Sequence, residues 1–308
     1  MAMIVETNYF GGFEQADDPK MLIIPVPYEY TTSYIKGTKN APQAILNASK
    51  HLDSFDEELW VDISKIGINT SNFVSSEFVS NKSKQPFVEI EQAVRAAVIN
   101  GSMPLVIGGE HSIICGSMKA IYDLFPDVSI LHFGARSYLK STTLENKFSN
   151  ECIFKRINET MPELKIVQVG IRSLSNEESN WLETSNPNIE IYFSRDRNRW
   201  NVADILTNLS KNVYLSFNFN ALDSSVMPSA SIPEPGGFSF EQACDIIKNV
   251  CAFKEIVGMD FVEFSPVANF NAPDFTAAKL IYKSIGYSFA RELGAFEEEE
   301  ATLVSSKL

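Results

Sequence analysis

The feature that most constrains the fold of this chain is a series of short, nearly continuous apolar runs that alternate with amphipathic stretches. Strands of a parallel sheet have this composition when helices cover both faces, because neither face of such a strand meets water. The intervening stretches, such as residues 41–52 and 87–100, have the apolar spacing of helices. Eight runs fit the description of a buried strand: 21–27, 61–69, 103–109, 127–133, 164–171, 188–194, 212–219 and 255–264.

This alternation predicts a single three-layer α/β/α domain, in which helices cover both faces of a central, mostly parallel sheet of eight strands. The chain of 308 residues is long enough to bury one large core, and neither a repeat nor a low-complexity linker divides it. We expect the domain to occupy residues 1–308, with its core at about 20–290. A short N-terminal extension and an acidic C-terminal tail, which includes Glu297 to Glu300, flank that core.

Charge and composition exclude several classes of partner. The formal net charge of -13 and the sequence pI of about 4.8 leave no basic excess to neutralise phosphates, so we expect no binding to nucleic acid or to an anionic membrane. No apolar stretch reaches the roughly 18 residues that a membrane span requires. The four cysteines form no CxxC pair, and the first residues lack the pattern of a signal peptide. We therefore expect a cytoplasmic protein.

Polar residues follow four of the predicted strands at the point where each strand ends. In parallel sheets the ligand site lies outside the carboxyl ends of the strands, so these segments are the candidates for a functional site. They are "GGEHS" at 108–112, "FGARSY" at 133–138, "FNFNALD" at 217–223 and "DFVEFSP" at 260–266.

Several of these motifs resemble the signatures of the ureohydrolases, the superfamily of arginase and agmatinase. The resemblance rests on "GGEHS", "QVGIRSLSNEE", "SFNFNALDSSVMPSASIPEPGG" and "GMDFVEFSPVANF", which occur in the family order between about residues 20 and 290. The segment "VPYEYTTSYIKGTKNAPQAIL" is closer to the agmatinase branch. The resemblance implies an arginase-like fold.

In active members of that superfamily, two histidines and four aspartates hold two Mn²⁺ ions, and a bridging hydroxide attacks the guanidinium carbon of the substrate. The chemistry explains these residue types. Two neighbouring dications need several anionic oxygen ligands, and together they lower the pKa of bound water enough to supply hydroxide.

Compared with this pattern, the chain retains one of the six family metal ligands. His111 in "GGEHS" matches the first histidine ligand. The family segment Asp-Ala-His-x-Asp is "GARSY" at 134–138, and the segment Asp-x-Asp is "NFN" at 218–220. The six ligand positions are therefore occupied by His111, Gly134, Arg136, Tyr138, Asn218 and Asn220.

The comparison with the family pattern then implies a chain that binds no metal cofactor and has no functional catalytic residue. Asn150 stands where the family has a histidine that shuttles protons or contacts the substrate. The other histidines, His51 and His132, lie in a helical segment and within an apolar strand, and we expect neither to replace a ligand. The loss of four carboxylates and the added charge of Arg136 also oppose the entry of a dication.

Glu263, Asp223 and Arg136 are the residues that we expect to bind a ligand. Glu263 matches the family glutamate that pairs with the substrate guanidinium, and an equally good interpretation is a buried carboxylate paired with Arg136. Asp223 and "PEPGG" at 233–237 retain the loop around the former metal edge. Because buried carboxylates need a counter-charge, we hypothesise that Arg136 replaces the metals as partner of Glu110, Asp223, Glu263, Asn218 and Asn220. Tyr138 would fill the remaining volume.

The sequence thus favours a ureohydrolase-fold homologue that has lost manganese binding and the hydrolysis of agmatine or arginine, and that has a structural or regulatory role. Active relatives form trimers or hexamers, so we expect a homo-oligomer or a hetero-oligomer with an active paralogue. Two alternatives stay open. The chain could bind a small cationic guanidine or polyamine through Glu263, or it could be a residual amidine hydrolase with an atypical metal site.

Overall fold

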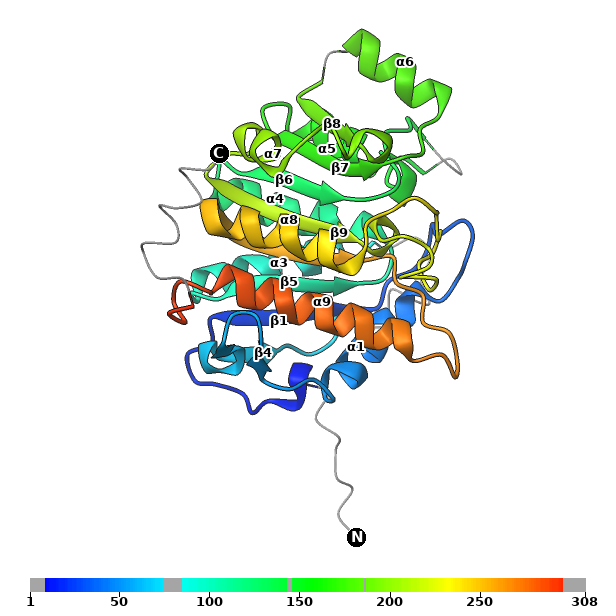
Figure 1. Ribbon diagram of the computed structural model, residues 1–308. Coiled ribbons are helices and arrows are strands. Elements are labelled where there is room, and N and C mark those ends of the chain that lie inside the picture. The colour runs from blue at the N-terminus through cyan, green and yellow to red at the C-terminus, as the bar shows by residue number, and fades with distance from the viewer. Residues whose placement is uncertain (1–8, 75–84, 143–145, 186, 296–308) are drawn as a thin grey trace.

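A single sheet of eight strands runs through the middle of the computed structural model, which describes residues 9–74, 85–142, 146–185 and 187–295 (Figure 1). The strand order is β4-β1-β5-β10-β9-β6-β7-β8, and each neighbouring pair is parallel. The prediction of an eight-stranded, mostly parallel sheet is confirmed. The strands are β1 (Met21–Val26), β4 (Ile68–Thr70), β5 (Met103–Gly108), β6 (Ser129–Phe133), β7 (Lys165–Ile171), β8 (Ile189–Phe193), β9 (Asn212–Asn218) and β10 (Glu255–Val262).

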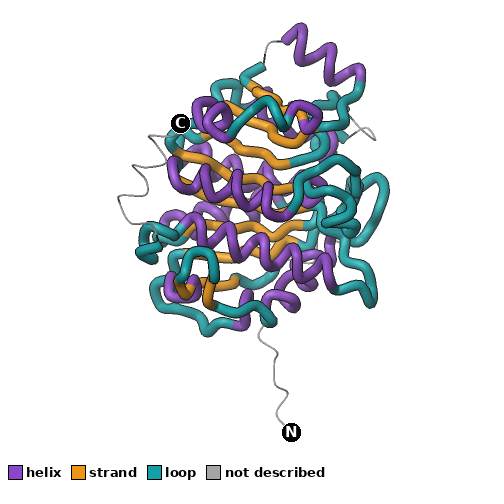
Figure 2. Tube along the Cα trace, viewed as in Figure 1, coloured by secondary structure: helices purple, strands orange, loops and turns teal. Residues whose placement is uncertain are grey.

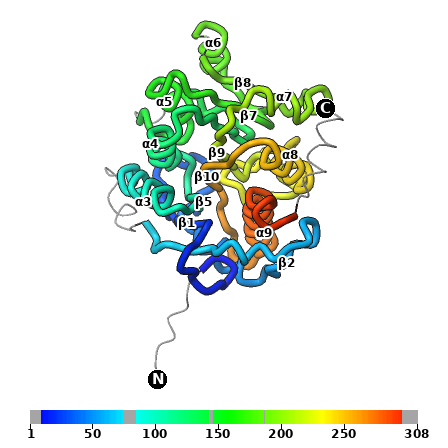
Figure 3. Tube along the Cα trace, turned by 90° about the vertical axis from the view of Figure 1, so that its left-hand side faces the viewer, coloured from blue at the N-terminus to red at the C-terminus, as the bar shows by residue number. Residues whose placement is uncertain are grey.

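Helices cover both faces of the sheet, as the alternation of patterns predicts (Figure 2). One apolar core lies under α1 (Ala41–Ser49), α7 (Val202–Asn208), α8 (Phe240–Phe253) and α9 (Ala272–Ser288). The other lies under α3 (Phe87–Ile99), α4 (Ile114–Leu124) and α5 (Ile153–Thr160). Figure 3 shows the sheet between these two layers. The helix α6 (Asn176–Ser185) lies beside β8, at one edge of the sheet.

Successive side chains of the central strands enter opposite cores. In β9, Val213, Leu215 and Phe217 join the core under α8 and α9, whereas Tyr214 joins the core under α4. Because strand side chains alternate in direction, a strand buried on both faces must be apolar throughout, and this is the pattern read in the sequence. Within the described ranges, none of the helices is long and apolar enough to span a bilayer.

The expected strand at 61–69 is wrong, because that segment is divided into three parts. β3 (Val61–Asp62) pairs with β2 (Phe55–Asp56) in a separate antiparallel hairpin, and a 3-10 helix follows at Ile63–Ile66. The Asp62 side chain accepts a hydrogen bond from the backbone nitrogen of Ser64 at 3.1 Å and so starts the helical turn. Gly67, with φ 73°, then reverses the chain into β4. The predicted N-terminal extension before residue 9 and the acidic tail after 295 lie outside the described residues.

A buried ion pair joins the β2–β3 hairpin to α9. Lys283 of α9 is 5% exposed, and its Nζ lies 3.0 Å from Oδ1 of the fully buried Asp56. The same Nζ lies 3.1 Å from Oε2 of Glu58 in the hairpin turn. Since both charges are removed from water, each depends on the other for its stabilisation.

We predict that Lys283→Met lowers the free energy of unfolding by about 3–5 kcal/mol, because it leaves the buried carboxylate of Asp56 without its cation. Urea denaturation measures the change. The control is Lys279→Met on the same helix, because the Lys279 side chain is 27% exposed and its Nζ lies 3.5 Å from Oε2 of Glu57, which is 67% exposed. This change should cost less than about 1 kcal/mol. Equal costs for the two variants would contradict the prediction.

Candidate functional site

The carboxyl ends of four adjacent strands, β5, β10, β9 and β6, bring the predicted motifs together at one edge of the sheet. Fully or almost fully buried polar residues gather there: Glu110, His111, Tyr138, Asn150, Asn218, Asn220 and Glu263. The segments that the strand-end rule selected therefore meet at one place in the fold. What these side chains contact is different from what the sequence led us to expect.

His111 is fully buried, and a chain of hydrogen bonds sets its protonation. Its Nε2 lies 2.8 Å from Oγ of Ser216, and that hydroxyl donates to Oδ1 of Asp260 at 2.8 Å. When Asp260 is ionised, the single hydroxyl proton of Ser216 goes to the carboxylate, so Nε2 of His111 donates to Ser216. Nδ1 is then left as an acceptor, and it contacts Nδ2 of Asn218 at 3.5 Å. Burial lowers the pKa of His111 to about 3, so the imidazole is neutral. Burial raises the pKa of Asp260 to about 7.

Ser216 and Asp260 are the residues of the site that sequence reasoning missed. Each interrupts an apolar strand, in "YLSFNF" and "GMDFVEF", and the register of β9 and β10 places them side by side. A buried polar residue needs a hydrogen-bond partner, so the occurrence of one in each of two predicted inner strands is the signal that could have found them.

Tyr138 lies at the centre of the site, with φ 54° and 2% exposure. Its hydroxyl oxygen accepts hydrogen bonds from Nδ2 of Asn218 at 3.1 Å and from Nδ2 of Asn220 at 2.9 Å. The amide oxygens face backbone donors instead: Oδ1 of Asn218 accepts from the nitrogen of Asn220, and Oδ1 of Asn220 accepts from the nitrogen of Ala135. Both asparagines thus direct nitrogen, which cannot ligate a cation, toward the phenol. Burial raises the pKa of Tyr138.

The ring of His132 occupies the space that a side chain at position 134 would need. A Cβ built on Gly134 would lie 2.5 Å from Cε1 and from Nε2 of His132. The imidazole packs against Phe154 with ring centroids 4.3 Å apart, and Nδ1 contacts Nε2 of Gln168 at 3.2 Å. His132 is therefore a core residue, as the sequence predicts, although its Nε2 has no hydrogen-bond partner among the described residues.

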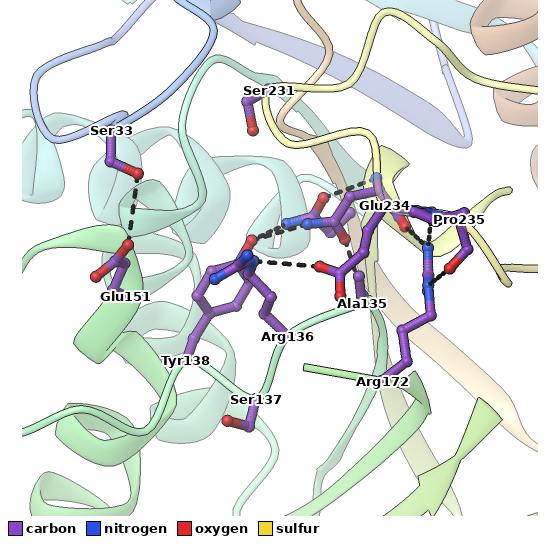
Figure 4. A network of polar contacts seen from close by, with 12 residues as sticks. Ser33, Ala135, Arg136, Ser137, Tyr138, Glu151, Arg172, Ser231, Glu234 and Pro235 are labelled. Carbon is purple, nitrogen blue, oxygen red and sulfur yellow. Dashed lines mark hydrogen bonds and ion pairs between the residues drawn. The ribbon is translucent and has the colours of Figure 1, made fainter. Parts of the chain in front are cut away.

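Arg136 does not provide the expected counter-charge. Its side chain is 32% exposed, and its Nε lies 3.4 Å from Oε2 of Glu234 in the "PEPGG" loop (Figure 4). In the part of the chain that the structure describes, it forms no ion pair with Glu110, Asp223 or Glu263. The reason is the local backbone: Arg136 bridges to Ser173 of the segment after β7, which directs it to the rim, while Tyr138 turns inward.

Glu263 is satisfied by neutral donors rather than by a cation. Its Oε1 accepts from the backbone nitrogen of His111 at 2.8 Å and from Nδ2 of Asn150 at 3.2 Å, and its Oε2 accepts from the hydroxyl of Ser231. Burial raises the pKa of Glu263 to about 7. Of the interpretation as a buried carboxylate paired with Arg136, the burial is confirmed at 0% exposure, but the pairing is wrong because Arg136 pairs with Glu234 instead.

Glu110 and Asp223 hold loops. Glu110 accepts from the backbone nitrogens of residues 30–32 and from the hydroxyls of Thr31 and Ser112. Asp223 accepts from Ser225 through Oδ1 and from the nitrogens of Gly236 and Gly237 through Oδ2. The hydrogen bonds from Ser225 lower the pKa of Asp223 to about 2. Both carboxylates find their partners within the loops around the site.

These residues do not fit a manganese pair. Among the described residues, no group of three or more histidine, cysteine, aspartate or glutamate side chains could hold a metal ion. His111 is the one retained residue at the six family ligand positions, and the oxygens of Asn218 and Asn220 already accept backbone hydrogen bonds. Hard dications prefer anionic oxygen ligands, and this cluster offers a phenol and two amide nitrogens instead.

Comparison with known proteins gives one consistent result. Residues 19–286 match the model of the arginase family. An N(1)-aminopropylagmatine ureohydrolase of Thermus thermophilus is 32% identical over 271 residues, which cover 88% of this chain and 90% of that protein. An agmatinase of Pyrococcus horikoshii is 28% identical, over 88% and 93% of the two chains. The crystal structure of an agmatine ureohydrolase of Thermoplasma volcanium superposes with a TM-score of 0.80 at 27% identity, over 89% and 92%.

We predict that Tyr138→Phe lowers the free energy of unfolding by about 2–4 kcal/mol. The buried amide of Asn220 loses its acceptor, and that of Asn218 retains only the 3.5 Å contact with Nδ1 of His111. Chemical denaturation measures the loss. Tyr34→Phe is the matched control, since Tyr34 is 70% exposed, and it should change stability by less than about 0.5 kcal/mol. A Tyr138→Phe variant as stable as the control would show that the phenol does not hold the two asparagines.

Gly134→Ala should cost about 1–3 kcal/mol, because the new methyl group collides with the ring of His132. The same substitution in a His132→Ala background should cost much less, since the ring is gone. A double-mutant cycle of unfolding free energies measures this coupling. Additive costs would mean that the two positions do not compete for space.

Proposed function

The chain belongs to the arginase family, and we propose that within this family it is a non-hydrolytic member that binds no manganese pair. The observation that carries the proposal is the contact of the Tyr138 hydroxyl with the side-chain nitrogens of Asn218 and Asn220. These residues stand at three positions where the family motifs have aspartates. A phenol bonded to two amides supplies no negative charge, whereas two dications require several.

The neighbourhood of this contact supports the same conclusion. His132 fills the space of a side chain at position 134, and the Nδ1 of His111 contacts Nδ2 of Asn218 at 3.5 Å. Asn150 cannot exchange a proton, because a carboxamide does not titrate in the physiological range. The relatives bear the names of ureohydrolases, so the proposal separates this chain from them in chemistry but not in fold.

A cation-binding role through Glu263 is less well supported. Both oxygens of this carboxylate accept hydrogen bonds, and the side chain has no exposed surface that a guanidinium group could reach. We therefore favour a structural or regulatory subunit, either as a homo-oligomer or as a mixed oligomer with an active relative. The homo-oligomers implied by the family resemblance motivate this part of the proposal.

The decisive experiment measures bound metal and urea release together. The purified chain and the Thermus thermophilus relative are incubated with excess Mn²⁺, desalted, and assayed by elemental mass spectrometry and for urea release from agmatine, N(1)-aminopropylagmatine and arginine. We expect this protein to retain far less than one manganese ion per polypeptide chain and to release no urea. The relative, treated in parallel, verifies that the conditions load and assay an active member.

Retention of two manganese ions per molecule of this chain would contradict the proposal. Urea release by this chain that depends on added Mn²⁺ would also contradict it. The readouts are independent. A chain that retains metal but releases no urea would refute the loss of the metal site while leaving the loss of hydrolysis in place.

A further inference from the structure

A small cavity opens beside Tyr138 at the same edge of the sheet. Its volume is about 160 Å³, which is the size of a small organic ion rather than of an extended polyamine. The chain segments after β6 and β7 and the beginning of α6 form its walls. The lining residues are Arg136, Tyr138, Lys140, Glu151, Ser173, Leu174, Ser175 and Glu178.

The two carboxylates in the cavity wall already have partners. Oε1 of Glu178 accepts from the hydroxyl of Ser137 at 2.7 Å and from the nitrogen of Leu139 at 2.9 Å. Its Oε2 accepts from the nitrogen and the hydroxyl of Ser175, at 2.8 and 2.7 Å. Glu151 pairs with Lys140, with 2.7 Å between Nζ and Oε2. The negative groups of the wall are thus bound to protein donors.

Arg136 is in the opposite situation. Among the described residues its guanidinium group donates no hydrogen bond, and its Nε is buried without a hydrogen-bond partner. The contact of Nε with Glu234 at 3.4 Å is an ion pair without hydrogen-bond geometry (Figure 4). A buried N–H group without an acceptor costs free energy, and Nε of Arg136 is such a group. A guanidinium group has five N–H donors in all. The cavity is therefore lined by a cation that is ion-paired with Glu234 but donates no hydrogen bond to a described residue.

We infer that this cavity binds the carboxylate group of a small anion, with Arg136 as the anchor. The planar guanidinium fork matches the two oxygens of a carboxylate, and such charge-assisted pairs are stronger than hydrogen bonds between neutral groups. Lys140 lies in the same wall, and an ammonium group has three donors, of which one contacts Glu151. The ligand has the opposite charge to a guanidine, because Arg136 repels a cation.

This inference deepens the proposed function and rests on it, since a manganese pair beside Arg136 would alter the charge of the whole edge. If both are correct, the site where relatives act on cationic substrates would in this chain be a binding site for an anion. The change from a cationic to an anionic ligand would follow from one residue, Arg136, at a position where the family has a histidine.

The experiment titrates the intact chain with sodium butyrate by calorimetry and by saturation-transfer NMR, with inorganic phosphate and agmatine as comparison probes. Arg136→Met removes the charge and retains the length of the side chain. Arg199→Met is the matched control, because Arg199 is 85% exposed and pairs only with Asp196 among the described residues. Arg136→Lys retains the charge without the planar fork.

We expect butyrate to bind the wild type and Arg199→Met equally, and Arg136→Met to bind it about 10- to 100-fold more weakly. Arg136→Lys should fall between these, and it provides the readout if Arg136→Met does not fold. Equal binding of butyrate by the wild type and Arg136→Lys would overturn the inference. Equal affinity of the wild type for phosphate and butyrate would also do so, and so would preferential binding of agmatine.

Repeating the titration after incubation with Mn²⁺ separates the two proposals. Absence of butyrate binding by a chain that retains no metal would refute the carboxylate site alone. Retention of manganese would refute the proposed loss of the metal site, whatever the butyrate titration gave.

Discussion

The arrangement of the whole site depends on the hydroxyl of Tyr138 and the two asparagine amides that donate to it. Each amide is fixed at its other end by a backbone donor, so its nitrogen faces the phenol, and that of Asn218 also contacts Nδ1 of His111 at 3.5 Å. The left-handed conformation of Tyr138 places the ring under the strand ends, in van der Waals reach of His111. A neutral, fully bonded cluster can be buried at low cost, whereas the same positions with carboxylates would need cations.

The buried carboxylates near this cluster do not pair with Arg136, the cation at its rim. Glu110 and Glu263 are buried, and each accepts several hydrogen bonds from neutral groups. Arg136 lies at the rim, against Glu234 and the small cavity. Hydrogen bonds from backbone, amide and hydroxyl groups satisfy the buried carboxylates without Arg136. The same edge of the sheet therefore contains a hydrogen-bonded interior and a charged rim.

Much of this could be predicted from single residues and their spacing. The runs that became β5, β6, β9 and β10 are apolar on both faces, so their burial and parallel order follow from composition, and their polar ends had to meet. The prediction of one strand at 61–69 failed because Asp62 starts a 3-10 helix within this apolar stretch, and Gly67 ends that helix. Ser216 and Asp260 were missed because a single polar residue inside a strand does not show which residue of another strand it contacts.

The sequence by itself determined the fold, the edge of the sheet where the polar strand ends meet, and most of the side chains at that edge, because burial and alternation are local properties. The tertiary structure alone decided which of those side chains pair. Arg136 was expected inside and lies at the rim, since a bridge to Ser173 and the turn at Tyr138 set its direction. Pairing depends on the direction of each side chain within a few ångströms, and residues distant in the chain set that direction through packing and hydrogen bonds.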